Sequence, residues 1–143
     1  MPIHYYDQDA ASKLKDKRKL TAFLRNLIAE ELGITQSTIA YVFCSDESLL
    51  QKNIRFLNHH TLTDIITFDL SEQDSELIAE IYISVDRVKE NAEKFGVSYQ
   101  TELHRVIFHG VLHLCGYKDK SPADKALMTN MENRCLQQYF DLA

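Results

Sequence analysis

One segment of the sequence, residues 103–114, constrains the fold more than any other. Its apolar residues would face almost every side of a helix, and a helix of that kind is normally surrounded by the rest of the protein. The segment therefore predicts a buried central helix, which Ser98 or Thr101 opens and Gly116 ends. Any fold for this chain must supply elements that cover this helix on several sides.

Two histidines interrupt this apolar helix, and they indicate a metal site. His109 and His113 lie four residues apart, a spacing that advances about 6 Å along a helix and returns to nearly the same face. Asp119 follows the turn at Gly116 and is placed to return as a third ligand, which would leave one coordination position for water. We therefore expect one divalent metal ion, with Zn²⁺ as the first candidate, on His109, His113 and Asp119. The alternative is that these histidines are ordinary hydrogen-bonded residues of the core.

The residue after the first histidine bears on the kind of enzyme. Metallopeptidases with a His-Glu-x-x-His helix carry a glutamate there as the general base. This chain has Gly110 at that position. A metallopeptidase is therefore only a minor alternative.

Length and composition predict a single domain that spans residues 1–143, because 45% of its residues are apolar and can fill a sizeable core. No stretch approaches the length needed to cross a bilayer, and the first residues lack a basic region followed by an apolar one. The three cysteines form no C-x-x-C pair, which is typical of a reducing compartment. We expect a cytoplasmic protein with no membrane partner.

The net charge of −5 argues against a protein that coats nucleic acid nonspecifically, and we expect no DNA partner. A local basic face is compatible with this charge. The basic run at residues 13–19 offers Lys17, Arg18 and Lys19 as candidate RNA-binding residues. The alternative is a solvated helix start.

The hydrophobic patterns predict one α+β domain in which a small mixed sheet of about four strands packs with about five helices. The expected strands are residues 3–6, 38–44, 65–70 and 77–85, and the last two form a hairpin. The expected helices are residues 13–32, 46–57, 86–95, the histidine helix, and a final helix that Ser121 caps and Pro122 begins. The final helix carries apolar residues at helical spacing, namely Leu127, Met128, Met131, Cys135 and Tyr139.

Two further motifs accompany the histidines, and together the three resemble those of a known family. They are Thr63-Asp-Ile-Ile-Thr-Phe68, Ala79-Glu-Ile-Tyr-Ile-Ser84, and the segment from His109 to Tyr117. In this order they are similar to the motifs of the YbeY family, which are bacterial metal-dependent endoribonucleases of ribosome maturation. The resemblance covers about residues 38–135.

The resemblance implies an α+β fold with a helix-bound metal at the floor of a basic groove. It also implies cleavage of single-stranded RNA, maturation of the 3′ end of 16S ribosomal RNA, and a part in 70S ribosome quality control. The implied partners are ribosomal RNA and the ribosome or its small-subunit proteins.

Matched residue by residue, His109 and His113 take the places of the family's first two ligands. Asp119 stands where the third ligand is usually a histidine. Aspartate also binds zinc, but it adds a negative charge and a harder oxygen donor, which would shift the metal preference away from zinc. In the strand motifs, Asp64 matches the family, whereas Glu80 stands where aspartate is common; both are candidate general bases.

The resemblance also implies that this chain lacks one positively charged side chain of the family. Leu57 stands where the family usually has an arginine that is thought to bind or polarise phosphate. Arg105 is the physical replacement, because it precedes His109 by four residues and lies on the same helix face. A surface ion pair between Arg105 and Glu102 is the alternative.

These residues favour a metallo-endoribonuclease. A cation in the site would lower the pKa of a bound water and polarise a phosphodiester oxygen. Arg105 would neutralise charge on the phosphate, and Glu80 or Asp64 would take a proton. The competing hypothesis is a non-catalytic ribosome-assembly factor whose metal only stabilises the fold.

Overall fold

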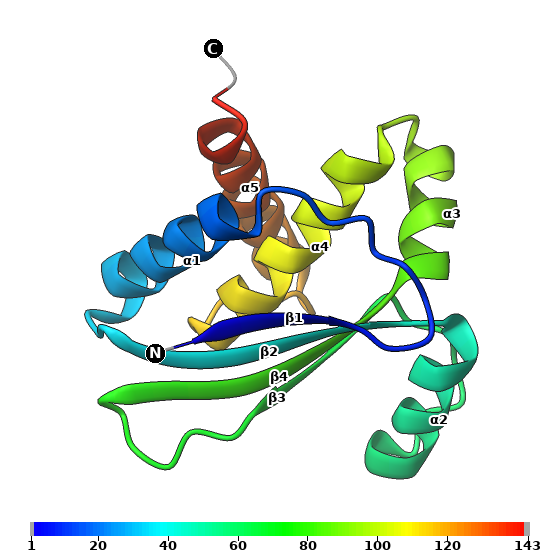
Figure 1. Ribbon diagram of the computed structural model, residues 1–143, viewed down its shortest axis with the longest axis horizontal. Helices are drawn as coiled ribbons and strands as arrows, with labels where there is room; N and C mark the ends of the chain where they lie inside the picture. Colours follow the sequence, from blue (N-terminus) through cyan, green and yellow to red (C-terminus); the bar gives the residue numbers. More distant parts are fainter. Residues whose placement is uncertain (1, 142–143) are drawn as a thin grey trace.

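A four-stranded mixed sheet forms the frame of the molecule in the computed structural model, which describes residues 2–141 (Figure 1). Across the sheet the order is β1 (Ile3–Asp7), β2 (Gln36–Cys44), β4 (Glu76–Ser84) and β3 (Ile65–Asp69). The first three run parallel, and β3 pairs antiparallel with β4. The predicted mixed sheet and its hairpin are confirmed.

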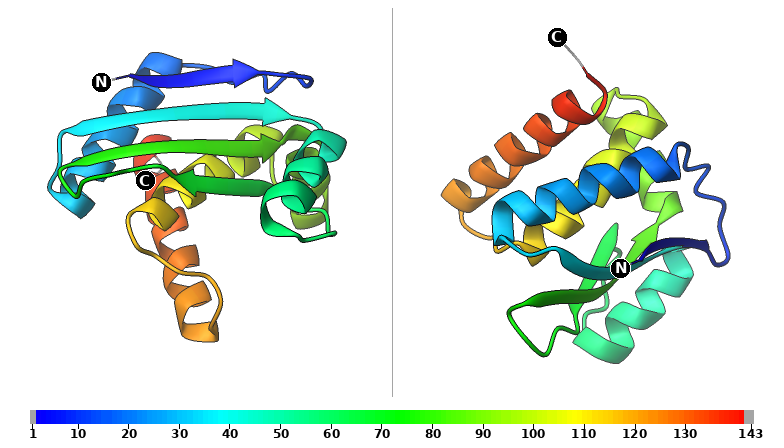
Figure 2. Two further views of the ribbon diagram at one scale, coloured as in Figure 1. Left: turned by 90° about the horizontal axis from the view of Figure 1, so that it is seen from below. Right: turned by 60° about the vertical axis from the view of Figure 1, so that its left-hand side comes forward.

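The helices divide unequally between the two faces of this sheet. On one face lie α1 (Lys17–Leu32), α3 (Val85–Phe95), α4 (Tyr99–Leu114) and α5 (Pro122–Tyr139). Among the helices of residues 2–141, only α2 (Asp46–Leu57) lies on the other face, near one end, so most of that face is free of helices (Figure 2). The side chains of β2 and β4 reflect this difference between the two faces. They alternate between buried positions and half-buried positions along each strand.

The apolar helix that contains the histidines, α4, is central as predicted. Leu103, Ile107 and Phe108 have no solvent exposure, and the helix packs against α3, α5 and the sheet. Gly110 permits a close approach to the sheet, because a Cβ atom there would lie 3.0 Å from Cδ1 of Ile65. This packing fixes the helix that carries His109 and His113.

Serine side chains begin the later helices as the sequence indicates. Ser98 accepts a hydrogen bond from the Thr101 amide at the start of α4, and Ser121 accepts one from the Asp124 amide at the start of α5. Pro122 takes the first position of α5. Both helices that bear on the histidine site therefore begin at residues set by local sequence.

The expected helix over residues 13–32 is wrong at its start. Lys13 and Asp16 have φ values of 55° and 54°, in the left-handed region, so the α-helix begins only at Lys17. Leu14, between them, is buried. In α5, Leu127 is 50% exposed, whereas the other apolar residues at helical spacing pack inward.

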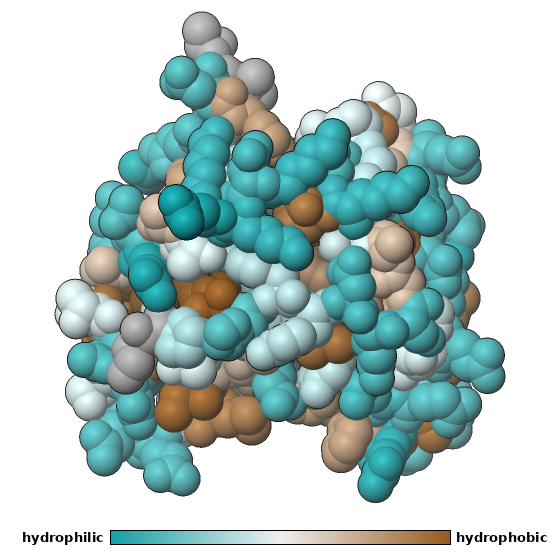
Figure 3. Space-filling view, in the orientation of Figure 1, coloured by the Kyte–Doolittle hydropathy of each residue, from teal (hydrophilic) through white to brown (hydrophobic). Residues whose placement is uncertain are grey.

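Hydrophilic side chains cover most of the face shown in Figure 3, and apolar ones reach the surface mainly around the sheet in its lower half. Over residues 2–141 no helix has both the length and the apolar character required to cross a membrane.

Candidate functional site: a histidine–carboxylate groove

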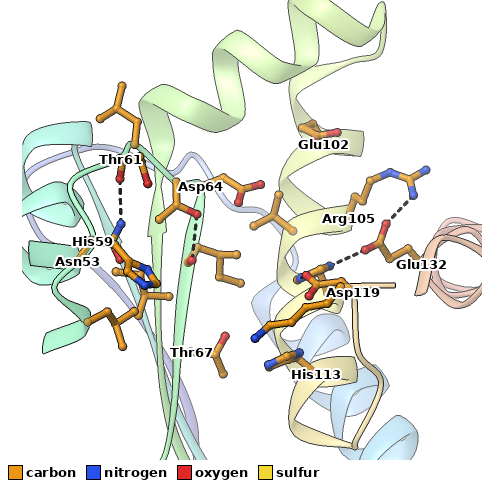
Figure 4. Close-up of a pocket in the computed structure, with 18 residues that line it drawn as sticks. Asn53, His59, Thr61, Asp64, Thr67, Glu102, Arg105, His113, Asp119 and Glu132 are labelled. Atoms are coloured by element: carbon orange, nitrogen blue, oxygen red, sulfur yellow. Dashed lines mark hydrogen bonds and ion pairs between the residues drawn. The ribbon is translucent and has the colours of Figure 1, made fainter. Parts of the chain in front are cut away.

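A polar groove of about 580 Å³ runs between α4 and the edge of the sheet. One wall comes from β3, the loop before it and the end of α2; the other comes from α4, the turn after it and α5 (Figure 4). The predicted site residues that line it are Asp64, Arg105, His109, His113 and Asp119. The structure thus brings these five together from three segments of the chain.

His109 is held between two carboxylates. Its Nδ1 lies 2.7 Å from Oε2 of Glu132 on α5, and its Nε2 lies 3.2 Å from Oδ2 of Asp119. Burial opposes the charged form of His109, but the hydrogen bond to Glu132 and the charges of Glu132, Asp119 and Asp64 outweigh it and raise the pKa. The imidazole is therefore both oriented and electrostatically stabilised by its neighbours.

The turn after α4 delivers Asp119 as the sequence predicts. Gly116 adopts a φ of 106°, and the amide of Tyr117 donates to the carbonyl of Leu112 over 3.1 Å. Such a conformation suits glycine, because a Cβ atom would be strained there. The reversal brings the Asp119 carboxylate back to His109.

His113 shares the groove with His109 but not its contacts. The two rings are nearly parallel, with 4° between their planes and 6.4 Å between their centroids. Within residues 2–141 no three His, Cys, Asp or Glu side chains converge closely enough to form a metal cage. The metal ion therefore stays a prediction.

The donor set nevertheless fits a divalent cation. Two imidazoles and a carboxylate are ligands that zinc and related metals accept. A metal-binding histidine usually donates its second ring N–H to a carboxylate, and Glu132 occupies that place behind His109. His109, His113 and Asp119 are the residues that would hold the ion.

Arg105 is turned toward α5. Its guanidinium donates to Oε1 of Glu132 over 2.9 Å and to Oδ1 of Asn133 over 2.7 Å. The alternative role for Arg105, an ion pair with Glu102, is wrong, because Glu132 and Asn133 engage the guanidinium instead. Arg105 lines the groove, but its charge is largely committed to fixing Glu132.

Two further carboxyl groups in the groove are shifted toward their neutral forms. Burial raises the pKa of Asp64, against the lowering effect of nearby His109. Burial also raises the pKa of Glu102 to about 7, opposed by Arg105. Near neutral pH the groove thus contains one carboxyl group, that of Glu102, which can exchange a proton.

Glu80, the other candidate base, lies outside the groove. Ala79 and Ile81 on either side of it are buried against the helices, so Glu80 points to the opposite face of the sheet. There it accepts a hydrogen bond from the Tyr82 hydroxyl over 3.0 Å. The structure therefore removes Glu80 from the candidate catalytic residues.

The basic run on α1 is also remote from the histidines. Lys17 and Arg18 line a shallow depression between α1 and β1, at the sheet edge opposite β3. Lys19 instead packs over the ring of Tyr139, 4.5 Å from its centroid. The three candidate RNA-binding residues therefore do not all line that depression.

Sequence reasoning missed three charged residues of the groove: Glu132, Lys120, and Glu102 in its role as a buried groove carboxyl. Glu132 was detectable in principle, because it is an acid at helical spacing from Met128 and Cys135 on the buried side of α5. No comparable signal marks Lys120. Its position depends on how the turn after Gly116 folds.

The fold and groove together define a small α+β protein with an oriented histidine–carboxylate site at one edge of its sheet. The family model described as "Endoribonuclease YbeY" matches residues 3–140. The chain belongs to this family.

Relatives of nearly the same length carry the same name. A protein from Bacteroides fragilis is 49% identical over 139 residues, which is 95% of this chain and 96% of the relative. Another from Bacteroides thetaiotaomicron is 47% identical over 136 residues, or 95% and 98% of the two chains. Both are called Endoribonuclease YbeY.

A solved structure shows the same fold. The solution structure of TM1509 from Thermotoga maritima aligns with a TM-score of 0.60 and 23% identity, and covers 98% of this chain and 90% of its own. At this identity the likeness bears on the fold alone.

Proposed function

We propose that this member of the endoribonuclease family cleaves single-stranded RNA at the groove, with a divalent metal ion on His109, His113 and Asp119. Family membership supports the hydrolysis of RNA, and no feature of the groove favours a peptidase or a purely structural role. When bound, the cation would supply Lewis acidity at the phosphodiester and lower the pKa of water. Zn²⁺ is the first candidate.

The observation that carries the proposal is the orientation of His109. Glu132 fixes Nδ1 at 2.7 Å, which leaves Nε2 directed toward Asp119 and the groove. A histidine that merely filled the core would not need a buried carboxylate at one ring nitrogen to aim the other ring nitrogen at a second carboxylate. Arg105 completes the support by holding the other oxygen of Glu132.

The remaining groove residues have roles that follow from their charge. Asp64 has a raised pKa and lines the groove, so it can accept a proton from the attacking water. Lys120 also lines the groove and makes no hydrogen bond or ion pair within residues 2–141. It is the cation available to neutralise charge on the phosphate, because Leu57 offers none and Arg105 is engaged.

The biological setting we propose is the maturation of the 3′ end of 16S ribosomal RNA and quality control of 70S ribosomes in the cytoplasm. Its support is the family to which the chain belongs. The ribosome or its small-subunit proteins would then be the partners.

The test is cleavage of a short single-stranded RNA by purified wild type and by His113→Ala. We expect the variant to lose metal and at least about 100-fold in rate, since the metal supplies most of the charge stabilisation. His60→Ala is the matched control, because it removes an exposed histidine that does not line the groove. A His113→Ala protein that cleaves as fast as wild type would refute the proposal.

A further inference from the structure

An exposed aromatic side chain stands beside the groove without a role in its chemistry. Phe56, near the end of α2, is 55% exposed. Lys52 and Arg55 flank it on the same helix, and Phe68 and Tyr82 extend the row of rings across the sheet. We call these five residues the α2 aromatic patch.

The rings of the patch hold one another in place. Phe56 meets Phe68 edge to face at 5.7 Å between centroids, and Phe68 meets Tyr82 in the same way at 5.9 Å. Such contacts orient the Phe56 ring although half of its surface faces solvent. An oriented exposed ring can bind a flat ligand with little loss of side-chain entropy.

Positive charge gathers around Phe56, whereas the far end of the patch also carries the Glu80 carboxylate, which accepts a hydrogen bond from the Tyr82 hydroxyl over 3.0 Å. The Lys52 ammonium lies 4.3 Å from the centroid of Tyr82 and 5.8 Å from that of Phe56. The guanidinium of Arg55 lies 5.4 Å from the centroid of Phe56. In a chain of net charge −5, two cations around an exposed ring form a local surface that complements a polyanion.

The patch adjoins the groove through α2 itself. Asn53 and Leu57 line the groove and form one row along the helix, since they are four residues apart. Lys52 and Phe56 form the neighbouring row, about 100° around the helix. A linear ligand that leaves the groove over Leu57 would therefore meet Phe56 next.

We propose that the α2 aromatic patch binds single-stranded RNA outside the cleavage groove, with an unpaired base stacked on Phe56. Lys52 and Arg55 neutralise the phosphates on either side of that base. The inference rests on the proposed function, because the groove must hold RNA for the patch to extend it. Stacking tolerates any base, so the patch adds affinity and a preference for unpaired strands rather than sequence specificity.

The chain contains a matched control for this surface. Phe95, at the end of α3, is 60% exposed and has the Lys94 ammonium 5.8 Å from its ring centroid, the same separation as between Lys52 and Phe56. Phe95 does not line the groove. Its removal therefore reproduces the loss of an exposed ring beside a lysine, without the proposed contact.

The experiment measures binding of a single-stranded RNA of about twelve nucleotides that contains 2-aminopurine, by fluorescence quenching and anisotropy. The full-length His113→Ala protein is used so that the RNA stays intact. We expect Phe56→Ala to raise Kd by about 5- to 150-fold and to abolish the quenching, since one stacked base is lost. Phe56→Trp should restore both signals, and Phe95→Ala should change neither.

The possible failures are distinguishable. Suppose that the His113→Ala protein binds the RNA and that adding Phe56→Ala to it leaves Kd unchanged. The patch then has no part in RNA binding, while the proposed function survives. Equal losses in Phe56→Ala and Phe95→Ala would also overturn the inference. If the wild type neither binds nor cleaves the RNA, the proposed function itself fails.

Discussion

His109 shows how much the groove depends on single contacts. Both of its ring nitrogens face carboxylates, Glu132 at 2.7 Å and Asp119 at 3.2 Å, although the three residues come from α4, the following turn and α5. The sequence predicts Asp119, because a helix stop at Gly116 returns the chain toward the preceding turn. It does not predict the pairing of Glu132 with His109, since nothing local reveals how α5 packs on α4. The prediction of Glu80 as a general base had a different weakness. Its strand was predicted correctly, but the alternation of side chains along β4 directs Glu80 to the face of the sheet away from the groove.

Lys120 provides a test of charge at the residue scale. Lys120→Ala should lower kcat/KM for single-stranded RNA about 10-fold or more, since the groove then lacks its available cation at the phosphate. Lys118→Ala is the control, because Lys118 lies two residues away and does not line the groove. Steady-state cleavage assays on both variants decide the point, and equal effects would assign Lys120 to the solvated surface.

At the scale of elements, α4 was the most predictable part of the chain and α1 the least. The apolar residues of α4 lie on almost every side of the helix, so any arrangement of the other elements must bury it. The start of α1 depends on two left-handed residues, Lys13 and Asp16, which lie within the basic run of residues 13–19 that itself favours a helix. Non-glycine residues in that conformation leave little sequence signal, so the error of four residues was unavoidable.

Ser98 tests the cap of the central helix. Ser98→Ala removes the acceptor for the Thr101 amide and should lower the free energy of unfolding by about 1 kcal/mol. Ser98→Asp keeps an acceptor and should retain most of the stability. Urea denaturation measures both, and an unchanged midpoint for Ser98→Ala would show that the cap contributes nothing.

At the scale of the whole molecule, burial of carboxyls in the groove couples stability to pH. The pKa of Glu102 is about 7 in the folded protein, above its ordinary value near 4.5, because burial disfavours the charged form. The folded state therefore holds this proton more tightly than the unfolded chain does. Its contribution to stability is complete below about pH 4.5 and is lost as the pH rises through 7.

Glu102→Gln should remove that penalty. We expect the variant to match wild type near pH 4.5 and to be more stable above pH 7, by on the order of 1–3 kcal/mol. Glu93→Gln, at an exposed site, controls for the loss of one negative charge. Thermal unfolding at both pH values measures the difference, and a gain that is independent of pH would contradict a buried, proton-holding Glu102.

The central claim is a metal ion held by His109, His113 and Asp119, with Glu132 orienting the first of them. Its most direct test is elemental analysis of the protein purified without a polyhistidine tag, followed by metal titration of wild type, Glu132→Gln and Asn133→Ala. We predict about one equivalent of a divalent metal in wild type, a 10- to 100-fold weaker affinity in Glu132→Gln and little change in Asn133→Ala. RNA cleavage by a wild-type protein that contains no metal, or full metal occupancy after both His109 and His113 are replaced by alanine, would contradict the account.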